Sequence, residues 1–257
     1  MLCFCLSLSS AIPSVPIAAA IADTSRTVPV KPVSVELRIA SAANFYLTLK
    51  KLKSIYEATS THEIVIIRGS TGKLYAQIVR GAPYDIFFSA DSQRVEKLVQ
   101  QGRGLNNQSW VYAKGQLALW RADADSSQQL REQLEAGNFH KLAIANPRTA
   151  PYGRASVQAL KSMELYEPLK KKLVYGENIS QVYQFVQSGA ADLGLVARAY
   201  VNHDMYWEVE SWQHKPVIQK MLILKQTKHP EQAAAFIKFI QSVAARKIIE
   251  QDGYQLD

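Results

Sequence analysis

Cysteine is nearly absent from this chain. Only two of the 257 residues are cysteine, Cys3 and Cys5, and both fall in an apolar, small-residue-rich stretch that ends in Ala20-Ile21-Ala22. This stretch is typical of a signal peptide with its cleavage site, so we expect a signal peptide over residues 1–22 and a flexible lead-in over residues 23–32. The mature chain would then have no disulfide, cysteine nucleophile or thiolate metal site. Export without disulfides favours the bacterial periplasm.

Familiar catalytic motifs are also missing. The chain has no G-x-S-x-G, no H-E-x-x-H and no paired carboxylates with a recognisable spacing. Gly69-Ser70-Thr71-Gly72-Lys73 resembles a phosphate loop but lacks the required spacing and a following hydroxyl residue. Asp85 and Asp91 are the acids that a hydrolase or transferase could use, although Asp91 is more simply a helix N-cap and Asp85 the start of a strand. We therefore expect a binding protein and not an enzyme, with a cleft hydrolase as the alternative.

Histidine is sparse and scattered. His203 and His214, with Asp204, could in principle gather a metal ion, but their spacing is not that of a metal site. The isolated histidines are His62, His140, His203, His214 and His229. We expect no cofactor and no metal held directly by protein side chains.

Charge and composition narrow the class further. The chain is 47% hydrophobic and 20% charged, which is enough apolar content for a sizeable core. The net charge is +8, yet the basic residues are dispersed, and Lys170-Lys171-Lys172 is the only triple run. This distribution argues against nucleic-acid binding, while the excess positive charge can steer an anion toward the protein.

Strand and helix patterns alternate from Val33 onward, which indicates an α/β fold with mainly parallel sheets covered by helices on both faces. Two lobes explain the succession better than one sheet: lobe 1 over 33–112 plus 217–257, and lobe 2 over 113–216. The last strand is assigned to lobe 1 because that lobe otherwise has only three obvious strands. The expected strands are 35–42, 63–67, 85–88, 116–120, 141–145, 173–175, 192–196 and 217–224. The expected helices follow Asn44 and cover 72–80, 91–99, 126–136, 154–163, 180–189, 230–242 and 243–251.

The stretch Arg68–Ile78 is where a strand, a glycine-flanked hydroxyl pair and a helix start follow one another. Ser70 and Thr71 stand where N-cap residues belong, among backbone N–H groups without intrahelical partners. Such a helix start suits an oxyanion, because the helix dipole favours negative charge there. Capping alone also explains every residue of the stretch.

Three other strand-to-helix turns have the same character. They lie at Asn44, which is a second N-cap candidate, at Tyr152 in the loop 149–153, and at Ile179. Ligands of open α/β sheets bind beyond the carboxyl ends of the strands, so we expect these turns to face a cleft between the lobes. None brings a carboxylate, and Arg154 is the only charge nearby.

Several segments together resemble one family. The segments are Ala42-Ala43-Asn44-Phe45, Gly69-Ser70-Thr71-Gly72-Lys73-Leu74 with Gln77-Ile78, Gly81-Ala82-Pro83, Asp85-Ile86-Phe87, Ser89-Ala90-Asp91, Ala145-Asn146-Pro147, Ala150-Pro151-Tyr152-Gly153, Glu177-Asn178-Ile179 and Leu193-Gly194-Leu195-Val196. In this order they resemble the periplasmic molybdate-binding proteins of bacterial ABC transporters, over essentially all of the mature chain. The resemblance implies a two-lobed class II periplasmic binding protein with its ligand in the cleft.

The resemblance also implies a ligand site. Spacing makes Thr71 the main residue of the second turn and Ser70 its supporting cap. Many members have a tyrosine directly after the strand 192–196, where this chain has Ala197, and Tyr152 is expected to supply the missing hydroxyl. Molybdenum would be held only as its oxyanion. The resemblance implies that Asn44 is a side-chain and backbone donor, that Thr71 donates from its hydroxyl and N–H, and that Tyr152 and Ile179 donate from their backbone N–H groups. The implied site residues are Ala43, Asn44, Ser70, Thr71, Tyr152 and Ile179.

The function implied is capture of molybdate or tungstate for an ABC importer, in partnership with a membrane permease and its ATPase. We expect a monomer. A fully deprotonated dianion suits a site of neutral N–H and O–H donors, whereas protonated phosphate needs an acceptor. A receptor for sulfate or phosphate is the alternative, and a transcription regulator is disfavoured because no helix-turn-helix precedes Val33.

Overall fold

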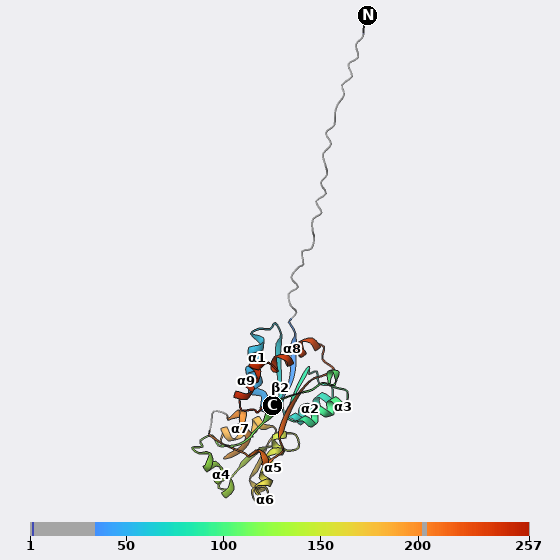
Figure 1. The fold of residues 1–257 in the computed structure, drawn as a ribbon. Coiled ribbons are helices and arrows are strands. Elements are labelled where there is room, and N and C mark those ends of the chain that lie inside the picture. Colours follow the sequence, from blue (N-terminus) through green and yellow to red (C-terminus); the bar gives the residue numbers. More distant parts are fainter. Residues whose placement is uncertain (1, 3–33, 202–204, 257) are drawn as a thin grey trace. The chain divides into compact units, whose positions relative to one another are not determined.

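Two five-stranded sheets carry the fold in the computed structural model, which describes residues 2, 34–201 and 205–256 (Figure 1). The predicted signal peptide and lead-in, Leu2 apart, lie outside the described residues, as do His203 and Asp204. The account below concerns the unit Val33–Asp257.

The first sheet has the strand order β2-β1-β3-β10-β4. β1 is parallel to β2 and β3, while β10 is antiparallel to β3 and β4. The prediction that the last strand joins the first set is confirmed, but the sequence analysis missed β4. The strands are β1 (Glu36–Ala42), β2 (Glu63–Gly69), β3 (Ile86–Ser89), β4 (Trp110–Gly115) and β10 (Val217–Ile223).

The second sheet has the order β7-β6-β8-β5-β9. β6 is parallel to β7 and β8, whereas β5 is antiparallel to β8 and β9. Both sheets are therefore mixed. In each, four strands run in one direction, in line with the predicted mainly parallel sheets, and a single strand runs against them, β10 in the first sheet and β5 in the second; the sequence analysis did not predict this antiparallel strand. The strands are β5 (Leu117–Trp120), β6 (Leu142–Ala145), β7 (Leu173–Gly176), β8 (Leu193–Ala197) and β9 (Tyr206–Glu208).

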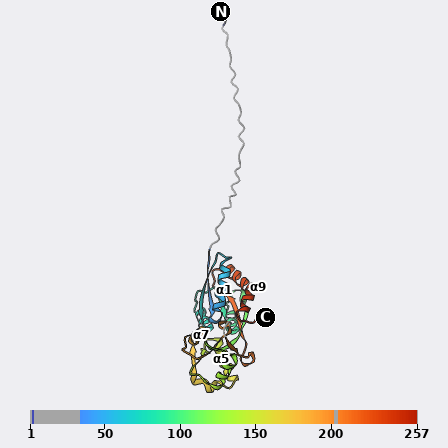
Figure 2. The same cartoon turned by 90° about the vertical axis from the view of Figure 1, so that its left-hand side faces the viewer.

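Helices fall into two groups, and in both views α1 and α9 lie side by side (Figures 1 and 2). The helices packed on the first sheet are α1 (Tyr46–Glu57), α2 (Thr71–Val79), α3 (Ser92–Gln100), α8 (Pro230–Ile240) and α9 (Val243–Gln251). Those of the second group are α4 (Ser127–Ala136), α5 (Pro151–Ser162), α6 (Tyr166–Leu169) and α7 (Ile179–Gln187). Short 3-10 helices are η1 (Ala43–Phe45), η2 (Leu105–Asn107), η3 (Lys170–Lys172), η4 (Arg198–Tyr200) and η5 (Ser211–Gln213).

Alternation along the central strands sends side chains to both faces of the first sheet. Ile39 and Phe88 belong to a core cluster with residues of α1, α8 and α9. Ala40 and Phe87 belong to another with residues of α2 and α3. Helices thus cover both faces of this sheet, as predicted.

Each sheet with its helices is called a lobe below. Lobe 1 contains the first sheet and lobe 2 the second. The sheets draw on residues 36–115 with 217–223 and on residues 117–208, and the exact limits of the lobes stay a prediction. No helix in the described part of the chain is long and apolar enough to cross a membrane.

Candidate functional site

One small cavity lies where four strand-to-helix turns meet. The turns follow β1 and β2 of lobe 1 and β6 and β7 of lobe 2. The cavity leaves about 10 Å³ of room for the centre of a water molecule. All six residues predicted as the site are among those lining it, so the structure brings them together, whereas their role in binding stays a prediction. The lining residues are Ala42, Ala43, Asn44, Ser70, Thr71, Ala90, Ala150, Pro151, Tyr152, Asn178 and Ile179.

The second turn differs from its predicted form. Ser70 is the N-cap of α2, as predicted, but its side chain makes no capping hydrogen bond. Its Oγ is buried and has no hydrogen-bond partner among the described residues. Thr71 is the first helical residue, and its Oγ1 accepts a hydrogen bond from the N–H of Ala90 at 3.2 Å. Within the described part of the chain, the Ser70 hydroxyl thus has no partner at all, while the Thr71 hydroxyl accepts one hydrogen bond and still has its proton to donate.

The first turn holds Asn44 inside η1, so Asn44 is not the N-cap that its position after a strand suggested; the N-caps are Ala42 for η1 and Phe45 for α1. The Asn44 side chain donates from Nδ2 to Oε1 of Gln219 at 2.8 Å and to the hydroxyl of Tyr254 at 3.4 Å. Tyr254 in turn donates to the carbonyl oxygen of Asn44 at 2.8 Å. The amide is thus held by the protein, which leaves backbone N–H groups as the free donors of this turn.

The third turn is helical and not the expected loop. α5 begins at Pro151, whose fixed φ suits a first helical position and whose missing N–H costs nothing there. Tyr152 follows in the first turn of the helix, and its side chain is buried. Gly153 permits this helix to start against the strand end, since a Cβ there would lie 2.1 Å from the carbonyl oxygen of Ala145.

The fourth turn starts α7 at Ile179, as predicted. Asn178 is the N-cap, and its Oδ1 accepts from the N–H groups of Ser180 at 3.0 Å and Gln181 at 3.2 Å. Because the first helical N–H groups have no intrahelical acceptor, the N–H of Ile179 has no partner within α7.

Tyr152 is the one titratable side chain in the lining of this cavity. Burial raises its pKa, an effect that hydrogen bonds from the Gln219 and Asn44 amides oppose only in part. The phenol is therefore neutral at physiological pH and can donate a proton to a hydrogen bond. The cavity lining offers neutral donors and no carboxylate.

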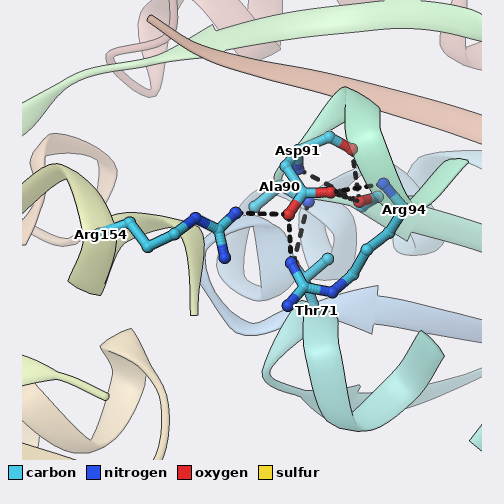
Figure 3. A network of polar contacts seen from close by, with 6 residues as sticks. Thr71, Ala90, Asp91, Arg94 and Arg154 are labelled. Carbon is cyan, nitrogen blue, oxygen red and sulfur yellow. Dashed lines mark hydrogen bonds and ion pairs between the residues drawn. The ribbon is translucent and has the colours of Figure 1, made fainter. Parts of the chain in front are cut away.

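A network of ionic groups lies next to Thr71 and Ala90, which are two of the cavity-lining residues (Figure 3). The Asp91 carboxylate caps α3 by accepting from the N–H of Arg94 at 3.0 Å, pairs with the Arg94 guanidinium, and accepts from Nη2 of Arg154 at 2.7 Å. Arg154 was expected to be the only charge near the turns, and that expectation is wrong because Asp91 and Arg94 face it. The arginine joins the two lobes, since Asp91 follows β3 and Arg154 lies in α5.

Asp85, the other acidic candidate, makes structural hydrogen bonds. Asp85 accepts from the N–H of Arg38 at 2.7 Å and from the hydroxyl of Thr227 at 2.6 Å, so it ties a strand end to a loop. Within the described ranges, no group of three or more His, Cys, Asp or Glu residues could hold a metal ion.

Four residues around the cavity escaped the sequence analysis. Gln219, Tyr112 and Tyr254 form the hydrogen-bonded layer behind Asn44. Tyr200, three residues after Ala197, donates its hydroxyl to the carbonyl oxygen of Ala43 at 2.7 Å. No local motif marks them, because their partners lie far away in the sequence.

Two α/β lobes around a cavity of neutral donors define a solute-binding protein. In agreement, residues 37–255 match the family described as Bacterial extracellular solute-binding protein.

Individual relatives are more specific. The chain is 37% identical over 227 residues to the molybdate-binding protein ModA of Azotobacter vinelandii, covering 86% of this chain and 90% of the relative. The solved Azotobacter vinelandii periplasmic molybdate-binding protein matches with a TM-score of 0.83 at 35% identity, covering 86% and 99% of the two chains. The substrate-binding domain of a putative molybdenum ABC transporter from Clostridium difficile matches with a TM-score of 0.65 at 29% identity, covering 87% and 99%. The chain belongs to the ModA family of bacterial extracellular solute-binding proteins.

Proposed function

We propose that this protein captures molybdate outside the cytoplasmic membrane and delivers it to an ABC importer. The observation that carries the proposal is the cavity of neutral donors, in which the buried Ser70 hydroxyl has no protein partner among the described residues. A buried hydroxyl without a partner costs about 1–3 kcal/mol, and an anion in the cavity would remove that cost.

The donors fit a dianion. Four helix starts direct backbone N–H groups and dipoles to one place, which stabilises negative charge without a counter-ion. We assign Ser70 the principal side-chain contact, with Thr71 beside it, and backbone N–H contacts to Ala43, Asn44, Tyr152 and Ile179. Tyr152 also supplies a hydroxyl in place of the tyrosine that Ala197 replaces.

The size of the cavity limits the ligand. Room of about 10 Å³ for a water centre is close to what a single water molecule needs. Organic solutes usually occupy pockets of about 300–1,000 Å³, so a small inorganic anion is the better occupant. Tungstate shares the charge and tetrahedral shape of molybdate, and we propose it as a second ligand. Sulfate or phosphate remain the alternatives.

Transport requires partners that the chain itself does not contain. We propose a periplasmic monomer that closes its lobes on the anion and then docks on a permease coupled to an ATPase. No chemical turnover is assigned, because Asp85 and Asp91 are both committed to structural hydrogen bonds and ion pairs.

A thermal-shift panel of molybdate, tungstate, sulfate and phosphate tests this function. A ligand that binds only the folded state raises the melting temperature. We expect a large rise with molybdate and tungstate and little change with sulfate or phosphate. A rise with sulfate or phosphate that exceeds the molybdate effect would favour the alternative receptor.

A further inference from the structure

Gln219 lies in a buried position behind the cavity. It is fully buried in β10, at the point where the pairing of β10 with β4 shifts register between Gln219 and Lys220. Such bulges redirect side chains and are frequent beside binding sites. The irregularity places the Gln219 amide among side chains from three distant parts of the chain.

The hydrogen bonds determine which way this amide is turned. Its Oε1 accepts from Nδ2 of Asn44 at 2.8 Å and from the hydroxyl of Tyr112 at 2.8 Å. The orientation of the Asn44 side-chain amide is fixed independently. Tyr254 donates its proton to the backbone carbonyl oxygen of Asn44, so the Tyr254 hydroxyl oxygen can only accept from Asn44 Nδ2. Because the Asn44 N–H points at this end of Gln219, that end is the oxygen; the Tyr112 hydroxyl, which also lies 3.3 Å from the Ser89 carbonyl oxygen, is the second donor there. Its Nε2 is therefore the end that approaches Tyr152.

Gln219 Nε2 donates to the Tyr152 hydroxyl oxygen at 3.5 Å. A phenol oxygen that accepts from the protein still has one proton to donate. In the described part of the chain no side chain or carbonyl is recorded as taking that proton, and Tyr152 is one of the residues lining the cavity. The proton is thus not used by any acceptor in the described part of the chain.

Gly115 supports the close approach of these two side chains. A Cβ at this position would lie 2.1 Å from the Tyr152 hydroxyl oxygen and 2.7 Å from Gln219 Nε2. The chain therefore leaves out a side chain at the one place where it would separate Tyr152 from Gln219.

We propose that Gln219 is a positioning residue that keeps the Tyr152 hydroxyl as a hydrogen-bond donor to the bound anion and so selects fully deprotonated oxyanions. A protonated oxyanion must donate its own proton, and Gln219 prevents Tyr152 from serving as the acceptor. This inference rests on the proposed function. It adds a residue that touches the ligand-contacting tyrosine but not the ligand.

A double-mutant cycle tests the coupling. Molybdate affinity is measured by calorimetry for the unmodified protein, Gln219→Met, Tyr152→Phe and the double variant. We expect Gln219→Met to weaken binding roughly tenfold in the unmodified protein, as loss of one oriented hydrogen bond to a charged group implies. In the Tyr152→Phe background the same change should weaken binding less than about threefold, because no hydroxyl remains to orient. Equal factors in both backgrounds would mean a merely structural role and overturn the proposal.

Selectivity gives a second readout. Gln219→Glu keeps acceptors for Asn44 and Tyr112 but offers Tyr152 an oxygen in place of an N–H. The affinity ratio of molybdate to hydrogen phosphate should fall in this variant and stay unchanged when Tyr152→Phe is already present. A fall of the same size in both backgrounds would reflect the added carboxylate alone and count against the proposal.

Folding is checked by the melting temperature without ligand. If Gln219→Met does not fold, Tyr112→Phe replaces it in the cycle, because it removes one of the two donors that orient the amide. The matched control is Tyr84→Phe, whose buried hydroxyl bonds Gln77 away from the cavity. The proposal is supported if the effects of Tyr112→Phe and Tyr152→Phe on molybdate affinity are not additive, while those of Tyr84→Phe and Tyr152→Phe are additive. Additive effects in both pairs overturn it. If the unmodified protein does not bind molybdate at all, the proposed function fails instead.

Discussion

The N–H of Gly72, at the start of α2 in lobe 1, donates to the carbonyl oxygen of Thr149, just before α5 in lobe 2, at 2.8 Å. A Cβ on Gly72 would lie 2.8 Å from that oxygen and 2.9 Å from Nη2 of Arg94. The glycine therefore permits the two lobes to meet directly beside the cavity.

Replacing this glycine should separate binding from stability. We predict that Gly72→Ala weakens molybdate binding about tenfold or more, because the added methyl group obstructs the closed arrangement. The ligand-free protein should be equally stable or more stable by about 0.5–1 kcal/mol, since alanine favours the helix. Calorimetry and melting curves measure the two effects, and unchanged affinity would show that the contact does not matter for closure.

Ser70→Ala should also weaken molybdate binding without lowering the stability of the ligand-free protein, for a different reason. Its Oγ has no partner in the described structure, so its loss should not destabilise the ligand-free protein. Molybdate affinity should fall by about 1.5–3 kcal/mol, the value of a hydrogen bond to a charged group.

The adjacent Thr71→Val is the matched comparison for Ser70→Ala. It removes the acceptor of the Ala90 N–H, so it should lower the melting temperature without ligand. If Thr71→Val weakens molybdate binding more than Ser70→Ala does, then Thr71 and not Ser70 is the principal side-chain contact.

The ion pair of Arg154 with Asp91 should contribute modestly to closure. Arg154 is partly exposed, with 33% of its side chain accessible, so solvent screens the pair. We predict that Arg154→Gln weakens molybdate binding only a few-fold, and less in high salt than in low salt. The control Arg131→Gln removes an exposed pair with Glu135 in α4 and should leave binding unchanged. A loss of a hundredfold or more would mean that Arg154 contacts the ligand.

Alkaline pH should destabilise the protein through its buried phenols. Burial raises the pKa of Tyr112, Tyr152 and Tyr254 above the ordinary value near 10. The unfolded chain loses these protons first, so the stabilisation is complete below about pH 10 and is lost as the pH rises beyond that value. Melting temperatures from pH 8 to pH 11 should fall steeply above about pH 10, and less steeply for Tyr152→Phe. Parallel curves for the two proteins would argue against a raised pKa at Tyr152.

The helix starts at Ser70 and Ile179 could be predicted from sequence because caps and strand ends are local signals. Pro151 and Gly153 suggested a loop, yet proline at a first helical position and glycine against a strand end are equally consistent with the helix found there. Local pattern could not decide between these alternatives.

Gln219 could not be found in this way. It is an isolated polar residue in an apolar strand, and its partner Asn44 is 175 positions away. Only the pairing of β10 with β3 and β4 brings it behind the cavity. The absence of a capping hydrogen bond from the Ser70 side chain could not be predicted either, because a capping serine and a ligand-binding serine occupy the same place in the sequence.

The most direct measurement is a crystal structure of the molybdate complex with anomalous scattering from molybdenum. The account predicts one molybdenum peak within the cavity, with its oxygens on the Ser70 hydroxyl, the Tyr152 hydroxyl and backbone N–H groups of the four turns, and no contact with Asp or Glu. A peak beside Asp91 and Arg154, or one coordinated by charged side chains elsewhere, would contradict it.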